Sequence, residues 1–166
     1  MLKKADNDGK RHDVSALGPN EHSALQQALK RRDPMPTFNF LDRYSPYALG
    51  ILRIVVALIF IAHGTQKLFG FPAPAGFNLP PLFSLFWFGA ILEAFGGLAI
   101  LLGVFTRPVA FILAGEMAYA YWMIHAKQSF FPNLNNGDAA ILYCFIFLYL
   151  VFAGAGAFSI DNRKNV

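Results

Sequence analysis

The chain has 166 residues, of which 55% are hydrophobic and only 14% are charged, and its formal net charge is +4. A soluble domain of this size carries about 25% charged residues. The composition therefore excludes an ordinary water-soluble domain and predicts a membrane protein, long enough for one domain.

Residues 1–44 form a polar segment that we expect to lie in the cytoplasm. They hold eight of the fourteen Lys and Arg residues and six of the ten Asp and Glu residues. The stretch EHSALQQALKRRD at 21–33 could form a short helix on the membrane surface. Disorder is the alternative, because isolated helices of this length are marginally stable. A signal peptide is not expected, since the charged stretch is long and the first apolar run begins late.

The rest of the chain contains four long apolar segments, at about residues 48–69, 82–105, 108–126 and 139–158. Each is close to the roughly 20 residues with which an α-helix crosses a bilayer. They predict an all-α fold, a bundle of four transmembrane helices over residues 45–161, with a cytoplasmic tail at 162–166.

Two positions predict where helices begin. Pro108 directly follows Arg107 and is expected at the first position of the third helix. Asp138 ends the turn sequence NNGD and is expected to cap the fourth helix. The linkers before the second and the fourth helix, GFPAPAGFNLPP and KQSFFPNLNNG, have the Pro, Gly and Asn content of loops.

The distribution of basic residues predicts the orientation in the membrane. Cytoplasmic ends of spanning helices carry an excess of Lys and Arg. With the N-terminus inside, the cytoplasmic side also receives Arg107, Arg163 and Lys164, whereas Lys67 and Lys127 lie outside. Both termini are therefore expected in the cytoplasm.

A weak repeat relates the first and third segments. His63, Gln66 and Phe69 have the same spacing as a second set, namely His125, Gln128 and Phe131. Two parallel helical hairpins, related by an axis along the membrane normal, would produce such a pattern. Chance similarity between sequences of biased composition is the alternative.

Cys144 is the only cysteine, which excludes an intrachain disulfide and a Cys-x-x-Cys redox pair. A dithiol quinone reductase is thereby excluded. The sequence GAGAFS ends an apolar segment and follows no predicted strand, so it is not a nucleotide-binding loop. We expect no metal site, and any redox reaction needs electrons from another protein.

Three ionisable residues lie within the predicted spans: Arg53, Glu93 and Glu116. Such groups are costly in lipid and point to function. The structural alternative is an ion pair that locks the bundle. We expect Arg53 to pair with Glu116, or else with Glu93. Glu93 shares a helix face with small residues, which indicates a helix contact, and it should be protonated unless Arg53 or Lys67 reaches it.

His63, Gln66, Lys67 and His125 come at the outer ends of their segments. They could form the rim of a cavity whose floor is Glu93 and Glu116. Interfacial solvation is the alternative, with Lys67 extending toward water. His125 follows Glu116 by nine residues, which places it on the opposite side of a regular helix. A haem between His63 and His125 is the least favoured hypothesis.

Several motifs resemble those of the DoxX family of small bacterial membrane proteins. They are HGTQKLFG, ILEAFGGLAILLGVFTRP, MAYAYWMIHAKQSFFPNLNNGD and GAGAFSID, within residues 49–161. The resemblance implies a multi-pass protein of the bacterial inner membrane, with four helices and an association with redox complexes. The family takes its name from a subunit associated with a thiosulfate:quinone oxidoreductase, and other members are linked to thiol stress. The polar N-terminal tail is not part of the shared pattern.

These observations lead to one principal hypothesis. A quinone headgroup would bind among the buried carboxyls, which can exchange protons with it, while a partner protein supplies the sulfur or flavin chemistry. The alternatives are a small-molecule or proton carrier that uses Glu93 and Glu116, and a scaffold for a redox complex. The expected contacts are the lipid bilayer and this partner, with a homo-oligomer also open and no nucleic acid involved.

Overall fold

The computed structural model describes residues 18, 20, 23, 39–74 and 76–163. The two alternatives for the stretch at 21–33, and the last residues of the C-terminal tail, lie outside the described residues. The regular elements, all helical within the described ranges, are α2 (Asn39–Asp42), α3 (Ser45–Phe69), α4 (Leu85–Ile91), the π-helical turn η2 (Leu92–Gly96), α5 (Gly97–Leu102), α6 (Thr106–Ala120), the π-helical turn η3 (Tyr121–His125), α7 (Pro132–Asn135), α8 (Asp138–Ala153) and α9 (Ile160–Arg163).

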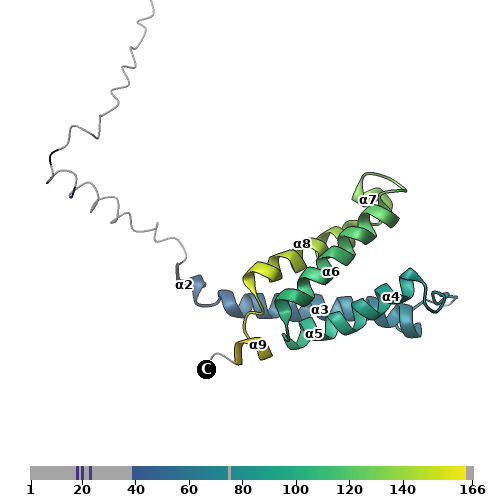
Figure 1. The fold of residues 1–166 in the computed structure, drawn as a ribbon, viewed down its shortest axis with the longest axis horizontal. Coiled ribbons are helices and arrows are strands. Elements are labelled where there is room, and N and C mark those ends of the chain that lie inside the picture. The colour runs from purple at the N-terminus through teal and green to yellow at the C-terminus, as the bar shows by residue number, and fades with distance from the viewer. Residues whose placement is uncertain (1–17, 19, 21–22, 24–38, 75, 164–166) are drawn as a thin grey trace, which may run out of the picture. The chain divides into compact units, whose positions relative to one another are not determined.

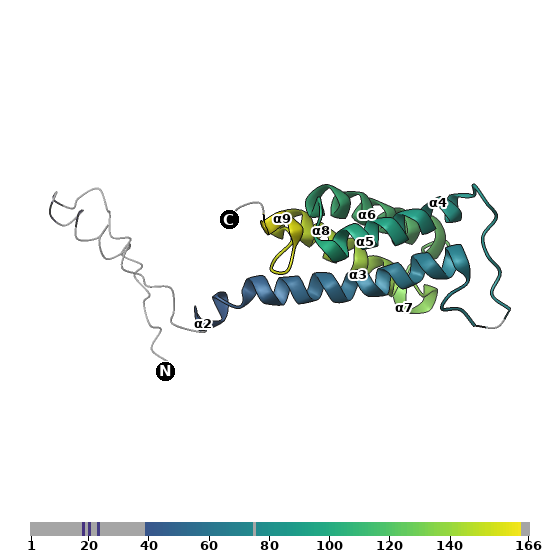
Figure 2. The same ribbon diagram turned by 90° about the horizontal axis from the view of Figure 1, so that it is seen from below.

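The long helices form two hairpins (Figure 1). In the first, α3 lies along the continuous helix made by α4, η2 and α5 (Figure 2). In the second, α6 packs along α8. A core of buried apolar side chains, including Phe60, Leu113 and Phe147, joins the two hairpins. The all-α fold expected from the sequence is confirmed.

Two of the helices have the length and hydropathy of a membrane span. Ser45–Phe69 has a mean hydropathy of 2.1, and Leu85–Leu102 has one of 2.0. Asp138–Ala153 is apolar but shorter, with 16 residues. Large apolar side chains point away from the bundle, as Ile51, Val55 and Leu58 do on α3. This surface suits lipid and not water. The count of four membrane spans and the internal repeat stay predictions.

The fourth apolar segment is helical over a shorter length than predicted. α8 ends at Ala153, five residues before the expected end at Phe158. Gly154 and Gly156 have φ values of +82° and +67°, which favour glycine and end the helix. The chain then continues through residues 154–159, the post-α8 loop, which returns to α3 where Ala157 N donates to Pro46 O.

Both predicted helix starts are wrong by one or two positions. α6 begins at Thr106, so Pro108 is its third residue. Gly137 is the residue before α8, and Asp138 already lies inside the helix without a capping hydrogen bond from its side chain. Local sequence signals place helix termini only to within a few residues.

The predicted ion pair between Arg53 and a glutamate is wrong. Arg53 is fully buried on α3 and its guanidinium donates to five backbone carbonyl oxygens. The acceptors are Ala155 (2.7 Å), Ile100 (2.6 Å), Leu101 (2.5 Å), Ala157 (3.2 Å) and Phe158 (2.9 Å). Orphan carbonyls at the end of a helix need donors. Arg53 therefore ties α3 to the end of α5 and to the post-α8 loop.

The N-terminus of α6 is capped by a residue that is distant in sequence. The two carboxylate oxygens of Asp161 accept hydrogen bonds from the backbone N–H groups of Phe105 (3.0 Å) and Thr106 (2.9 Å). A carboxylate at this place satisfies free N–H groups and complements the helix dipole. The cap ties α9, which follows α8, to the start of α6.

We expect Asp161→Ala to lower the free energy of unfolding by about 1–2 kcal/mol, the usual cost of losing a helix cap. The thermal midpoint in detergent should fall by a few degrees, since roughly 2–4 °C corresponds to each kcal/mol at this chain length. Asp138→Ala is the matched control, because Asp138 is exposed in the first turn of α8 and caps nothing. Equal midpoints for the two variants would contradict the capping role.

Candidate functional site

The first hairpin is closed by direct backbone contact at Gly64. A Cβ atom at this position would lie 2.5 Å from the backbone nitrogen of Ala94 and 2.9 Å from the carbonyl oxygen of Ala90. Only glycine permits so close an approach, as in other membrane helix pairs. The contact brings the last turns of α3 against η2.

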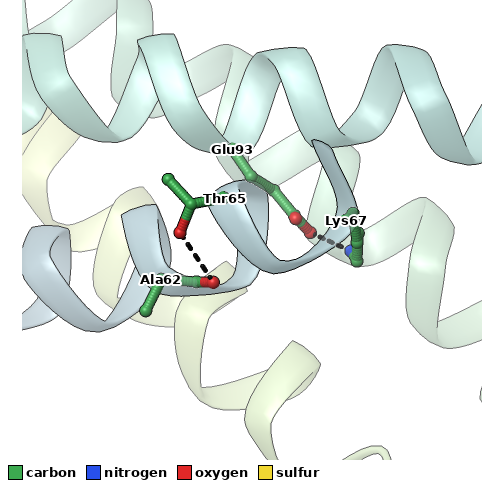
Figure 3. Close-up of polar contacts among 4 residues, drawn as sticks. All are labelled: Ala62, Thr65, Lys67 and Glu93. Carbon is green, nitrogen blue, oxygen red and sulfur yellow. Dashed lines mark hydrogen bonds and ion pairs between the residues drawn. The ribbon is translucent and has the colours of Figure 1, made fainter. Parts of the chain in front are cut away.

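Lys67 follows Gly64 by three residues and reaches η2. Its Nζ atom lies 2.5 Å from Glu93 Oε1, and this is the salt bridge found among the described residues. The Lys67 side chain is 31% exposed and that of Glu93 only 5%. Figure 3 shows the two side chains pointing toward each other between their helices. Lys67 therefore turns inward, and the alternative in which it extends toward water is wrong.

Glu93 lies in the π-helical turn η2, one residue after its start. A π turn inserts an extra residue into a helix and shifts the side chains that follow, and such turns are frequent at functional sites. The second π turn, η3, contains His125.

Glu116 approaches the same place from the second hairpin. It lies on α6, and its Oε1 atom would be 3.2 Å from a Cβ atom at Gly89 on α4. Between the hairpins is a cavity of about 300 Å³, which we call the carboxyl cavity. It is lined by Lys67, Leu85, Phe86, Phe88, Gly89, Leu92, Glu93, Ile112, Glu116, Met117, Tyr119, Ala120 and Ile124.

Each carboxyl group in this cavity has one oxygen atom without a hydrogen-bond partner in the described structure. These atoms are Glu93 Oε2 and Glu116 Oε2, and both are buried. A buried polar atom that lacks a partner costs roughly 1–3 kcal/mol. Lys67 is the one cation among the lining residues, so two acids share a single ammonium group. The cavity thus offers acceptors to a ligand.

The remaining residues predicted for the site lie outside the lining of the carboxyl cavity. Arg53 is bound to backbone carbonyls, as described above. Gln66 Nε2 donates to Pro72 O at 2.9 Å and so fixes the loop after α3. His63 is exposed, with its ring edge-on to Tyr143 at 6.0 Å. His125 Nδ1 lies 2.9 Å from Asn135 O, which joins η3 to α7.

The structure therefore brings together three of the seven predicted residues: Lys67, Glu93 and Glu116. The predicted rim of His63, Gln66 and His125 does not line this cavity. Gly89, one of the small residues expected on the face of Glu93, lies one turn before it and lines the same cavity. Sequence reasoning missed the apolar walls, because Phe86 and Ile112 have no distinctive pattern among so many apolar residues.

This fold and this cavity define an α-helical membrane protein with ionisable groups buried between two hairpins. A family model described as DoxX matches residues 48–126. The chain belongs to the DoxX family, which confirms the resemblance found in its motifs.

Three relatives cover most of the chain. A protein of Haemophilus influenzae described as uncharacterized is 46% identical over 129 residues, which are 75% of this chain and 96% of that protein. The inner membrane protein YphA of Escherichia coli is 32% identical over 78% of this chain and 100% of its own length. The inner membrane protein YqjF of Escherichia coli is 30% identical, over 69% and 90% respectively. No solved structure matches the chain.

Proposed function

We propose that the chain is an inner-membrane component of a quinone-linked oxidoreductase and binds the quinone headgroup in the carboxyl cavity. The observation that carries the proposal is the pair of buried, unpartnered oxygens, Glu93 Oε2 and Glu116 Oε2, on an otherwise apolar cavity. A structural ion pair accounts for Lys67 and Glu93. It does not account for the second carboxyl group at Glu116.

The chemistry of a quinone suits these surroundings. Its ring is apolar and fits between Phe86, Phe88 and Ile112, while its two oxygens need polar partners in the same space. Reduction of a quinone consumes two protons and two electrons, and carboxyl groups near the oxygens can hold and transfer those protons. The isoprenoid tail of a membrane quinone would lie in lipid, along the exposed faces of α4 and α6.

The electrons come from a partner protein in this proposal. The chain has one cysteine, Cys144, and no Cys pair. A partner subunit that contains a dithiol or a reduced flavin would supply two electrons, and the quinone would become a quinol. Sulfur or thiol redox stress is the setting that the family resemblance favours.

A small-molecule or proton carrier is the second candidate function. The observation that favours it is the same excess of carboxyl groups over cations, which could pass protons through the cavity. The two functions differ in their need for a quinone. A carrier would move its substrate in vesicles that contain no quinone and no partner protein.

Localisation and orientation complete the proposal. Two relatives are named as inner membrane proteins, and the excess of basic residues on one side supports a cytoplasmic location for both termini. An alkaline phosphatase fused after Val166 should therefore be inactive in a bacterial host, whereas one inserted near Gly76 should be active. The reverse pattern would overturn the orientation. Equal levels of fusion protein on an immunoblot are the control.

The binding proposal is tested by filling the carboxyl cavity. Gly89→Leu places a large side chain where even a Cβ atom approaches Glu116, so a quinone headgroup should no longer fit. Gly115→Leu is the matched control on α6, because nothing lies within 4 Å of a Cβ atom there. Binding of a short-chain ubiquinone to purified protein in nanodiscs is measured by equilibrium dialysis.

We expect saturable binding by the wild type and the control, and a loss of at least about tenfold in affinity for Gly89→Leu, since even one lost hydrogen bond to a charged group costs roughly this much. Both variants should keep the thermal midpoint of a folded protein. Absence of saturable binding by the wild type, or unchanged binding by Gly89→Leu, would overturn the proposal.

A further inference from the structure

We infer that the carboxyl cavity binds the reduced quinol in preference to the oxidised quinone. The inference rests on the proposed function and specifies which form of the ligand the site recognises. It depends on the hydrogen-bonding inventory of Glu93, Glu116 and Lys67.

The atoms without partners in the cavity are carboxyl oxygens. An ionised carboxylate can only accept hydrogen bonds. The carbonyl oxygens of a quinone are also acceptors, so a quinone placed against Glu93 Oε2 or Glu116 Oε2 brings two acceptors together. A quinol has an O–H donor at each end of its ring. It therefore carries the donors that the carboxyl oxygens, unpartnered in the described structure, can accept.

The cation in the lining does not reverse this preference. Lys67 Nζ already lies 2.5 Å from Glu93 Oε1, so its charge is directed to that carboxylate. Its other N–H groups can donate equally to a quinone oxygen or to a quinol oxygen, because a phenolic oxygen accepts as well as donates. Arg53 lies outside the cavity and donates to backbone carbonyls.

The protonation state of Glu116 changes the size of the preference but not its direction. A protonated Glu116 has one O–H donor that could serve a quinone carbonyl. Glu93, held against Lys67 as a carboxylate, still offers an acceptor at Oε2. Of the two ligands, only the quinol carries a donor for that atom.

A preference for quinol has a consequence for the proposed oxidoreductase. A site that binds the reduced form more tightly raises the reduction potential of the bound couple. Each tenfold preference corresponds to about 30 mV for a two-electron couple. The bound quinone would thereby become a better acceptor of electrons from a thiol or flavin partner.

The test compares three ligands of almost the same shape with the wild-type protein in nanodiscs under anaerobic conditions. They are decylubiquinone, its quinol obtained by chemical reduction, and the dimethyl ether of that quinol, which lacks both O–H donors. We expect the quinol to bind about tenfold more tightly than the quinone, as is usual for a hydrogen bond to a charged group. The dimethyl ether should bind no better than the quinone.

Glu116→Gln provides the second measurement. An amide side chain offers N–H donors as well as an acceptor, so the ratio of quinol to quinone affinity should fall to a few-fold or less. Gly115→Leu, which changes a position with open space around it, should keep the wild-type ratio. A Glu116→Gln protein that keeps the wild-type ratio would overturn the role of Glu116.

The outcomes separate this inference from the function on which it rests. Equal affinities for the quinol, the quinone and the dimethyl ether would overturn the preference and leave quinone binding standing. Failure of the wild type to bind any of the three would overturn the proposed function itself. The comparison of ligands uses only the wild-type chain, so it does not depend on the folding of a variant.

Discussion

Replacing Arg53 with alanine is expected to abolish accumulation of the folded protein or to lower its thermal midpoint by more than 10 °C, as roughly 2–4 °C per kcal/mol implies. The change removes the donors for five backbone carbonyls, whose hydrogen bonds to Arg53 are buried in two cases and partly buried in three. Each buried acceptor without a partner costs about 1–3 kcal/mol, so a total on the order of 5 kcal/mol is reasonable after relaxation. The effect is measured by thermal unfolding in detergent, in the presence of a fluorescent thiol reagent that labels Cys144 as the protein unfolds.

Arg53→Lys should be nearly as damaging. An ammonium group has three donors at one point, whereas the planar guanidinium presents five in a fork that reaches α5 and the post-α8 loop together. Arg43→Ala is the control, since Arg43 is exposed and contacts the ring of Tyr44. A midpoint for Arg53→Ala within 2 °C of the Arg43→Ala value would show that the carbonyls find other donors.

The second large effect is expected at Gly64. Gly64→Ala places a methyl group 2.5 Å from the backbone nitrogen of Ala94, where only movement of a whole helix can relieve the overlap. Overpacking of this kind typically costs about 1–3 kcal/mol. Because Lys67 is one turn away, separation of α3 from η2 should also break the ion pair with Glu93. Quinone affinity should therefore fall together with the thermal midpoint.

Gly115→Ala is the control for this change, since it adds the same methyl group inside a helix where nothing lies within 4 Å. Alanine is the better helix former by about 1 kcal/mol, so the control should be neutral or slightly stabilising. If the thermal midpoint and the quinone affinity of Gly64→Ala equalled those of the control, the close backbone contact would not be required for either property.

The two ends of the bundle have different roles. At the end that we place in the cytoplasm, Arg53 and Asp161 satisfy backbone groups at the end of α5, in the post-α8 loop and at the start of α6, so the motifs there are structural. At the other end, Lys67, Glu93 and Glu116 lie around a cavity with atoms left unpartnered. Stability experiments should therefore respond most to changes at the first end, and ligand binding to changes at the second.

Much of the fold could be predicted from the sequence. The low fraction of charge and the long apolar segments were sufficient to predict helices in a membrane, because lipid requires each spanning segment to satisfy its own backbone. α3 was located to within three residues at one end and exactly at the other. The motifs around Lys67 and Glu93 were sufficient to predict the family, and both residues lie in the site.

The tertiary structure alone decided the partners of the charged residues. The depth of Arg53 in its helix predicted a glutamate, yet its donors reach carbonyls that became available when Gly154 and Gly156 ended α8 early. Nor does sequence choose between Arg53 and Lys67 as the partner of Glu93, which in the structure is Lys67. The sequence determines which charged groups are too costly to leave unpaired in lipid. Only the packed backbone determines which hydrogen-bond donors and acceptors lie close enough to pair with them.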